Sequence, residues 1–139
     1  MHENFEGKLF SIDAPNSDSD WWVKHPITQL PEGKDVGWAV PPRLKARWEL
    51  VLGKSKETMP PLLEKIGGIE MFLHDSEHTP ENMLFEYDLA YRHLRHGGVL
   101  LSDDFAMAEG EFERFCAKVG EEAITERFSR MGAMRKTAS

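Results

Sequence analysis

The stretch from Ile69 to Asp104 constrains the fold of this chain most strongly, because it contains two apolar runs that each end in acidic residues. The first run ends at His74 and is followed by Asp75, and the second ends directly before Asp103. Between the two runs, apolar side chains recur at helical spacing, which predicts a strand, a helix and a second strand. Strands joined in this way run parallel, so both acidic ends are expected at the carboxyl edge of one sheet, where open α/β sheets bind ligands.

Weaker signals on both sides of this stretch continue the alternation of strand and helix. The pattern predicts an α/β fold with a mostly parallel sheet and helices on both faces. Strands are expected at residues 8–13, 48–52, 69–74 and 99–102, and helices at 55–66, 79–94 and 109–119. A helical turn is expected at 43–47 and a terminal strand pair at 123–128 and 133–136.

Residues with strong positional preferences set the expected helix ends. Ser55 and Thr79 are predicted N-caps, and Gly97 is predicted to end the helix that begins near Thr79. Pro60 and Pro61 fall within the preceding helix, where proline is tolerated only in the first turn.

The length of 139 residues suits a single domain, 1–139, with its own hydrophobic core. Within it, residues 14–42 form a long segment rich in Pro, Gly, Asp and Ser that also holds three tryptophans, Trp21, Trp22 and Trp38. Disordered segments are poor in aromatic residues, so this segment is predicted to be an ordered loop that covers a pocket or a partner surface.

Charge and hydropathy exclude two classes of partner. The net charge is −7 at pH 7, whereas nonspecific nucleic-acid binders need surplus lysine and arginine to displace counterions from phosphates. The apolar runs are far shorter than a membrane span, and the sequence does not begin with a signal-peptide pattern. We therefore expect a cytoplasmic protein that binds neither nucleic acid nor membranes.

The single cysteine, Cys116, excludes an intramolecular disulfide and a multi-cysteine metal site. It shares a helical pattern with Phe112, Phe115 and Val119. Free cysteines in such patterns are usually buried, so a structural thiol is favoured over a nucleophile.

Asp75, Asp103 and Asp104 are the sharpest candidates for a functional site. Neighbouring parallel strands lie about 4.8 Å apart, so carboxylates that follow their ends can converge on one cation. Oxygen ligands of this kind suit Mg²⁺, Mn²⁺ or Ca²⁺ better than zinc. The structural alternative is that these acids only form helix caps and turns.

Histidines near these acids divide into two groups. His78 lies three residues after Asp75 and is a candidate ligand or general base, because imidazole titrates near neutral pH. His93 and His96 stand with arginines near a predicted helix end, where cations complement the helix dipole, so a structural role is favoured for them. The motif H-E-x-x-H of zinc peptidases does not occur.

Asp13 follows the first predicted strand, at the position where an acid accepts hydrogen bonds from the ribose hydroxyls of a nucleotide cofactor. This single residue does not by itself establish a cofactor site.

Two segments carry a family resemblance. The run FLHDSEHTPENMLFEYDLA, residues 72–90, and the run LRHGGVLLSDD, residues 94–104, closely resemble class I S-adenosylmethionine-dependent methyltransferases, in particular their small-molecule O-methyltransferase-like branch. The resemblance covers roughly residues 7–136 and implies a Rossmann-like methyltransferase sheet.

The resemblance also implies roles for individual residues. Asp13, Ser55 and Asp75 match positions that bind the cofactor, although Lys54 stands where the family often has an acid. Asp75, Asp103 and Asp104 match the positions that hold a divalent cation, Mg²⁺ or Mn²⁺, in metal-dependent members. His78 matches the position of a catalytic base or metal ligand.

The resemblance further implies that the family's first strand and its glycine-rich cofactor loop would precede Gly7, and no such loop is found in this sequence. We therefore expect a domain that is incomplete at its N-terminus and impaired in cofactor binding. The chain is either part of a longer enzyme or a remnant whose sheet closes differently.

Two functions from different classes follow. The first is methyl transfer from S-adenosylmethionine to the hydroxyl of a small-molecule acceptor, with a divalent cation orienting that acceptor. The second is a methyltransferase-like fragment without catalysis, acting as a binding or assembly module whose exposed sheet edges favour a homo-oligomer. Because both remain open, the sequence does not establish that the chain is an active enzyme.

Overall fold

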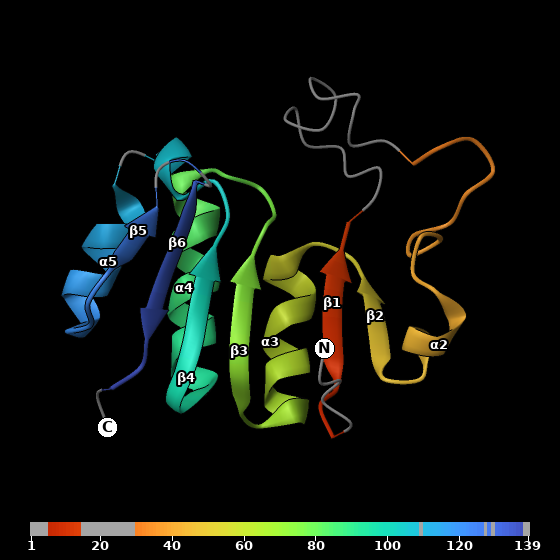
Figure 1. The fold of residues 1–139 in the computed structure, drawn as a ribbon, viewed down its shortest axis with the longest axis horizontal. Helices are drawn as coiled ribbons and strands as arrows, with labels where there is room; N and C mark the ends of the chain where they lie inside the picture. The colour runs from red at the N-terminus through yellow and green to blue at the C-terminus, as the bar shows by residue number, and fades with distance from the viewer. Residues whose placement is uncertain (1–5, 15–29, 109, 127, 129, 138–139) are drawn as a thin grey trace. The chain divides into compact units, whose positions relative to one another are not determined.

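The strand, helix and strand predicted at the centre of the chain are present in the computed structural model, which describes residues 6–14, 30–108, 110–126, 128 and 130–137. The first strand, β3, spans Ile69–His74, the helix α4 spans Pro80–His93, and the second strand, β4, spans Leu94–Ser102. β3 and β4 pair in parallel, as expected (Figure 1).

The predicted beginning of α4 is confirmed. Thr79 precedes the helix in an extended conformation, and its Oγ1 accepts a hydrogen bond of 3.3 Å from the backbone N–H of Asn82. Pro80 follows in the first turn, where its missing N–H has no cost.

Helix α4 ends at His93, within one residue of the predicted end at Leu94, but Gly97 is not its stop, because Leu94 already belongs to β4. Leu94 pairs with Ile69 before an irregularity in the ladder, and Gly97 turns the chain there with a φ of +82°. His96 consequently lies in a strand instead of near a helix end. The pairing of Leu94 with Ile69 and the hydrogen bond from the N–H of Gly97 to the carbonyl oxygen of Lys136 hold this stretch in the sheet.

The chain divides into two compact units, one up to Met59 and the other from Pro60 onward. The first contains β1 (Leu9–Asp13), the short helix α2 (Pro42–Lys45) and β2 (Trp48–Leu52). β1 and β2 form a parallel pair. The division falls inside helix α3 (Ser55–Ile66), and a single domain spanning 1–139 stays a prediction.

Helix α3 differs from expectation at its start. The carbonyl oxygen of Lys54 accepts the hydrogen bond from the N–H of Thr58 at 3.0 Å, so Lys54 occupies the N-cap position and Ser55 is the first helical residue. Pro60 and Pro61 lie inside the helix, beyond its first turn. Their missing N–H groups cost two helical hydrogen bonds. The helix is stabilised by its buried apolar side chains, Met59, Leu62 and Leu63.

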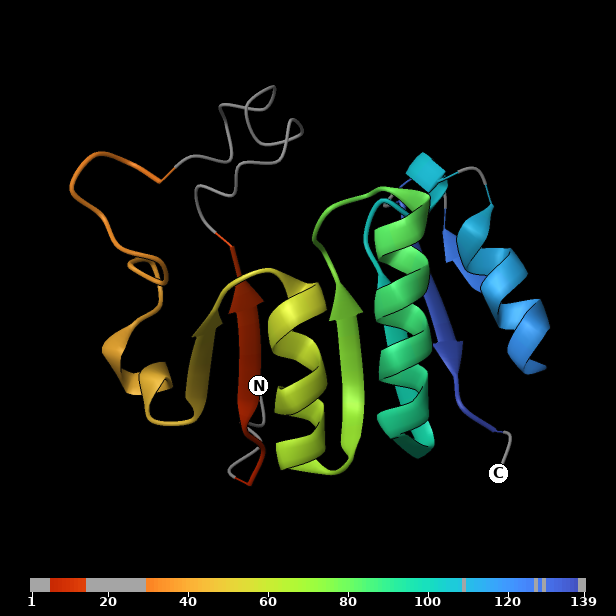
Figure 2. The ribbon, with the colours of Figure 1, turned by 180° about the vertical axis from the view of Figure 1, so that it is seen from behind.

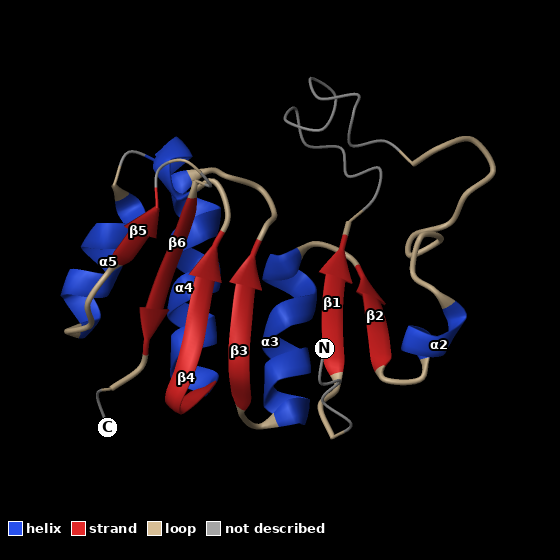
Figure 3. Ribbon diagram, in the orientation of Figure 1, coloured by secondary structure: helices blue, strands red, loops and turns tan. Residues whose placement is uncertain are grey.

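The second unit contains a mixed sheet with the strand order β3-β4-β6-β5. β5 (Ile124–Glu126) and β6 (Met131–Arg135) form the predicted terminal pair, and both ladders that involve β6 are antiparallel. The α/β class is thus confirmed, with the parallel pairing confined to β1–β2 and β3–β4 (Figure 3).

Helix α5 (Glu111–Val119) packs beside α4 on one face of this sheet, after a short 3-10 helix, η2 (Phe105–Ala108) (Figure 2). Aromatic side chains form the core between the helices and the sheet. The ring of Tyr87 lies 5.7 Å from that of Phe112 and 5.4 Å from that of Phe115. All three side chains are at least 98% buried.

Only part of the predicted tryptophan loop, 14–42, is described. Residues 15–29, with Trp21 and Trp22, lie outside the described residues. Trp38 is 52% exposed, and the Nζ of Lys34 lies 5.5 Å from the centre of its ring. Whether the loop covers a pocket stays a prediction.

Among the described residues, no helix combines the length and apolar character that crossing a membrane requires.

The prediction of a buried structural thiol is confirmed, since Cys116 is fully buried in α5. Burial is the main cause that raises the pKa of this thiol to about 11, and the nearby charge of Glu113 is the next.

We expect no reaction of Cys116 with a thiol reagent at pH 8 in the folded protein and rapid reaction in urea, measured by absorbance. As the pH rises, the thiol of Cys116 loses its proton at lower pH in the unfolded chain than in the folded protein. Its contribution to stability is therefore complete below pH 9 and falls as the pH rises toward 11. Fast reaction of the folded protein at pH 8 would contradict this assignment.

Candidate functional site

The pairing of β3 with β4 brings the two acidic strand ends together. His74 lies opposite Ser102, and the backbone N–H of Asp103 donates a hydrogen bond of 2.9 Å to the carbonyl oxygen of His74. Asp75 and Asp103 therefore each come directly after one member of the pair His74 and Ser102. Their convergence follows from strand register and confirms that the two acids share one sheet edge.

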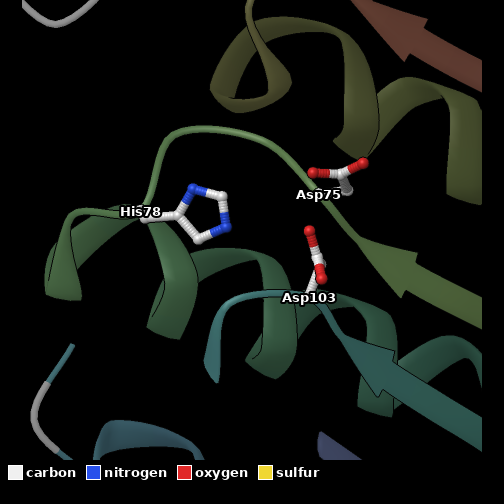
Figure 4. A group of neighbouring side chains, drawn as sticks. All are labelled: Asp75, His78 and Asp103. Carbon is white, nitrogen blue, oxygen red and sulfur yellow. The ribbon is translucent and has the colours of Figure 1, made fainter. Parts of the chain in front are cut away.

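His78 completes a group of three potential ligands with these acids. One oxygen of Asp75, one ring nitrogen of His78 and one oxygen of Asp103 all lie within 4.8 Å of one another. Figure 4 shows the three side chains turned toward one another, with Asp75 and His78 in the loop between β3 and α4 and Asp103 directly after β4. Asp75 is exposed, whereas the other two residues are half-buried and both ring nitrogens of His78 are shielded from water.

Asp104 lies outside this group of three. Its carboxylate forms an ion pair of 2.8 Å with the guanidinium of Arg130, and its backbone has a φ of +45°. This unusual conformation turns the chain directly after Asp103. A metal-binding role for Asp104 stays a prediction, and the ion pair would have to open for its carboxylate to serve as a ligand.

A buried hydrogen-bond network lies behind the three side chains. The carboxylate of Glu86, on α4, receives hydrogen bonds from Ser76 Oγ at 2.8 Å and from Asn82 Nδ2 at 2.9 Å. Its other oxygen lies 2.8 Å from His74 Nδ1. The side chains of His74 and Glu86 are 0% and 4% exposed, so this pair is shielded from water.

Tyr87 extends the polar cluster into the core. Its hydroxyl lies 2.6 Å from Ser102 Oγ, and its ring makes an edge contact with that of His74. Burial raises the pKa of Tyr87 well above its usual value, which keeps the hydroxyl protonated at neutral pH. The ends of both strands are thus anchored to α4 by buried polar side chains.

Sequence reasoning identified Asp75, His78 and Asp103 but missed this supporting network. Glu86 and Asn82 stand four residues apart on the face of α4 that also carries Met83, Tyr87 and Ala90. A carboxylate on an otherwise apolar helix face is costly to bury without partners. That mismatch is the signal that could have marked Glu86 as a buried, hydrogen-bonded group.

The other two predicted cofactor residues belong to the first unit. Asp13 ends β1, and its carbonyl oxygen accepts a hydrogen bond of 2.9 Å from the N–H of Gly53, just after β2. Burial raises the pKa of Asp13, and a hydrogen bond from the backbone of Ala14 opposes this shift. Ser55 begins α3 shortly after the same strand end. Asp13 and Ser55 therefore lie at and just beyond the carboxyl ends of the β1–β2 pair, and their roles in cofactor binding stay a prediction.

Similarity to solved structures supports the same fold. A putative O-methyltransferase from Klebsiella pneumoniae is 15% identical, with a TM-score of 0.54, and the match covers 96% of this chain and 64% of that one. An O-methyltransferase from Bacillus cereus, solved in complex with SAH, is 12% identical, with a TM-score of 0.51. That match covers 94% of this chain and 63% of the Bacillus protein. This chain therefore spans less than two thirds of either protein.

No curated protein matches the sequence. The model of one protein family, described as "Methyltransferase domain", matches residues 1–105, a span that includes Asp75, His78 and Asp103. The match covers well over half of the 139 residues. The chain therefore belongs to the methyltransferase-domain family.

Proposed function

We propose that this chain takes part in the transfer of a methyl group from S-adenosylmethionine to the hydroxyl of a small molecule, with help from a divalent cation. The observation that carries the proposal is the convergence of Asp75, His78 and Asp103 at the carboxyl edge of the β3–β4 pair. Membership of the methyltransferase-domain family supports the reaction class, and the O-methyltransferase neighbours support an oxygen acceptor.

The three side chains fit a hard divalent cation. Bonds from Mg²⁺ or Ca²⁺ to its ligands measure roughly 2.1–2.6 Å, so two ligand atoms of one ion lie at most about 5 Å apart. The ligand atoms of Asp75, His78 and Asp103 lie within 4.8 Å of one another. Two carboxylates and one imidazole leave further coordination positions for water and an acceptor oxygen.

Each residue then has a distinct role in the proposal. Asp75 and Asp103 would hold the cation, and His78 would act as the third ligand or accept the proton of the acceptor hydroxyl. A bound cation would make that hydroxyl more acidic and fix its orientation. Asp104 would be a fourth ligand only after release from Arg130.

Three residues carry the predicted cofactor roles. Asp13 would accept hydrogen bonds from the ribose hydroxyls, Ser55 would contact the adenine, and Asp75 is the third proposed cofactor residue. Bound S-adenosylmethionine would supply the methyl group. We also place this activity in the cytoplasm, with no nucleic acid or membrane as partner.

A binding or assembly module without catalysis is the second candidate. β3 is an edge strand of its sheet, and its Met71 and Leu73 side chains are 62% and 52% exposed. Exposed apolar residues on an edge strand favour pairing with another strand, including that of a second copy.

Calorimetric titration with S-adenosylmethionine separates the two candidates. For the methyltransferase, we expect saturable binding below the millimolar range and a weakening of about tenfold or more in Asp13→Ala, which lacks the ribose acceptor. Glu6→Gln, which removes an exposed charge from the same unit, is the matched control. If the chain and Asp13→Ala both fail to bind at millimolar cofactor, the module is favoured.

A further inference from the structure

We propose that Glu86 is a positioning residue, which fixes the loop after β3 so that Asp75 and His78 face Asp103. This inference rests on the proposed function, because the three side chains are taken as the cation site. Glu86 itself lies on α4, behind the loop, and is 3% exposed. It is not one of the three converging ligands.

The polar partners of Glu86 come from three neighbouring segments. Its carboxylate receives a hydrogen bond from Ser76, in the loop, and lies within hydrogen-bond distance of His74, the last residue of β3. It also receives one from Asn82, in the first turn of α4. One carboxylate thus joins the strand end, the loop and the helix start.

Asn82 also holds the same loop, through two hydrogen bonds of its side-chain amide. Its Nδ2 lies 3.1 Å from Ser76 Oγ and 3.2 Å from the carbonyl oxygen of Glu77. The contacts thus reach Ser76 and Glu77, the two residues that separate Asp75 from His78. Because those two residues are held in place, the spacing of the two proposed ligands is fixed before any cation arrives.

The burial of the Glu86 carboxylate carries a free-energy cost. Burying a carboxylate is unfavourable unless its oxygens are hydrogen-bonded, and an apolar side chain on α4 would fill the same space without that cost. A role in core packing alone leaves the choice of a charged residue unexplained. A role in holding a polar loop explains both the charge and its partners.

The chain provides a matched control in Glu121, a second buried carboxylate, which is 7% exposed. It receives hydrogen bonds from the N–H of Thr137 at 2.6 Å, from Thr137 Oγ1 at 2.7 Å and from the hydroxyl of Tyr91 at 3.0 Å. These partners are remote in sequence from the loop of residues 75–78. Glu121→Gln therefore removes a buried charge, as Glu86→Gln does, but changes no contact of the loop that carries the proposed ligands.

The experiment compares the unaltered chain with Glu86→Gln, Ser76→Ala and Glu121→Gln by two measurements. Ser76→Ala removes the link between the loop and Glu86 but leaves the contacts of Glu86 with His74 and Asn82. Amide hydrogen exchange over residues 75–79 reports loop order without metal, and calorimetry with Mn²⁺ reports affinity. We expect Glu86→Gln and Ser76→Ala each to speed exchange at these residues and to weaken Mn²⁺ binding by about tenfold or more, whereas Glu121→Gln changes neither.

The possible results decide the inference separately from the proposed function. Unchanged exchange and unchanged Mn²⁺ affinity in Ser76→Ala would overturn the positioning role, as would equal effects in Glu121→Gln. If the unaltered chain does not bind Mn²⁺, the cation part of the proposed function fails, and the exchange data alone then decide whether Glu86 orders the loop. If Glu86→Gln does not fold, the comparison of Ser76→Ala with Glu121→Gln remains decisive.

Discussion

Replacing Asp103 by asparagine is expected to weaken Mn²⁺ binding by more than about 100-fold, because changes to groups that merely support a metal ligand already cost about 10–100-fold. Asp75→Asn should have a similar effect, since both carboxylates belong to the group of three within 4.8 Å. Either substitution preserves the size of the side chain and removes its charge. Isothermal titration calorimetry with MnCl₂ measures the change directly.

Two further variants sharpen this result. Glu122→Gln removes one exposed acidic charge from the same unit, and it should leave Mn²⁺ affinity unchanged. Asp104→Asn tests the predicted fourth ligand. Full affinity in this variant would assign Asp104 to its ion pair with Arg130, and a large loss would add it to the site. Unaltered binding in both Asp75→Asn and Asp103→Asn would refute the cation site.

Replacing Phe112 by alanine is expected to lower the free energy of unfolding of the second unit by about 3–5 kcal/mol, as for other phenylalanines removed from a core. The Phe112 side chain is fully buried and contacts the rings of Tyr87 and Phe105. A Cβ atom built on Gly132 would lie only 2.8 Å from its ring, so the ring packs directly against the β6 backbone. Smaller side chains would leave a cavity there.

Urea unfolding can follow each unit by its own chromophore. Both tyrosines, Tyr87 and Tyr91, lie in the second unit, and all four tryptophans lie before Met59. Tyrosine absorbance should therefore report the effect of Phe112→Ala. Phe128→Ala is the control, because that side chain is 97% exposed and its loss should change stability by no more than about 0.5 kcal/mol. Equal midpoints for the two variants would contradict the assigned core.

The same data test the prediction of a single domain. If tryptophan fluorescence and tyrosine absorbance change together in every variant, residues 1–139 unfold as one cooperative domain. If Phe112→Ala shifts only the tyrosine transition, the two units are independently stable.

The fold was most predictable from the sequence where local pattern and tertiary pairing agree. β3 has the predicted bounds, and Thr79 caps α4 as expected, since an apolar run and a capping residue each act over a few neighbours. The extent of β4 was not predictable, because its first residues join the sheet through remote partners: Leu94 pairs with Ile69 of β3, and the N–H of Gly97 bonds to the carbonyl oxygen of Lys136. Local preference carries no information about such a partner.

The candidate site divides in the same way. Asp75 and Asp103 were predictable because parallel strands bring their carboxyl ends to one edge, whatever the rest of the chain does. The ion pair of Asp104 with Arg130 was not predictable, because these two residues lie far apart in the sequence and meet only in the folded chain. Glu86 was missed for a related reason, because helical periodicity shows which face is buried but not which polar groups meet there.

The pairing of His74 with Ser102 has a consequence for how this protein can vary. The ladder places two loop positions side by side through backbone hydrogen bonds, which do not depend on the side chains found there. Lineages can therefore exchange the acids at 75 and 103 and keep the sheet, so that chemistry and stability evolve on different residues. The retention of Asp75, His78 and Asp103 in any relative would then report selection on the reaction, whereas retention of Tyr87 or Phe112 would report selection on the fold.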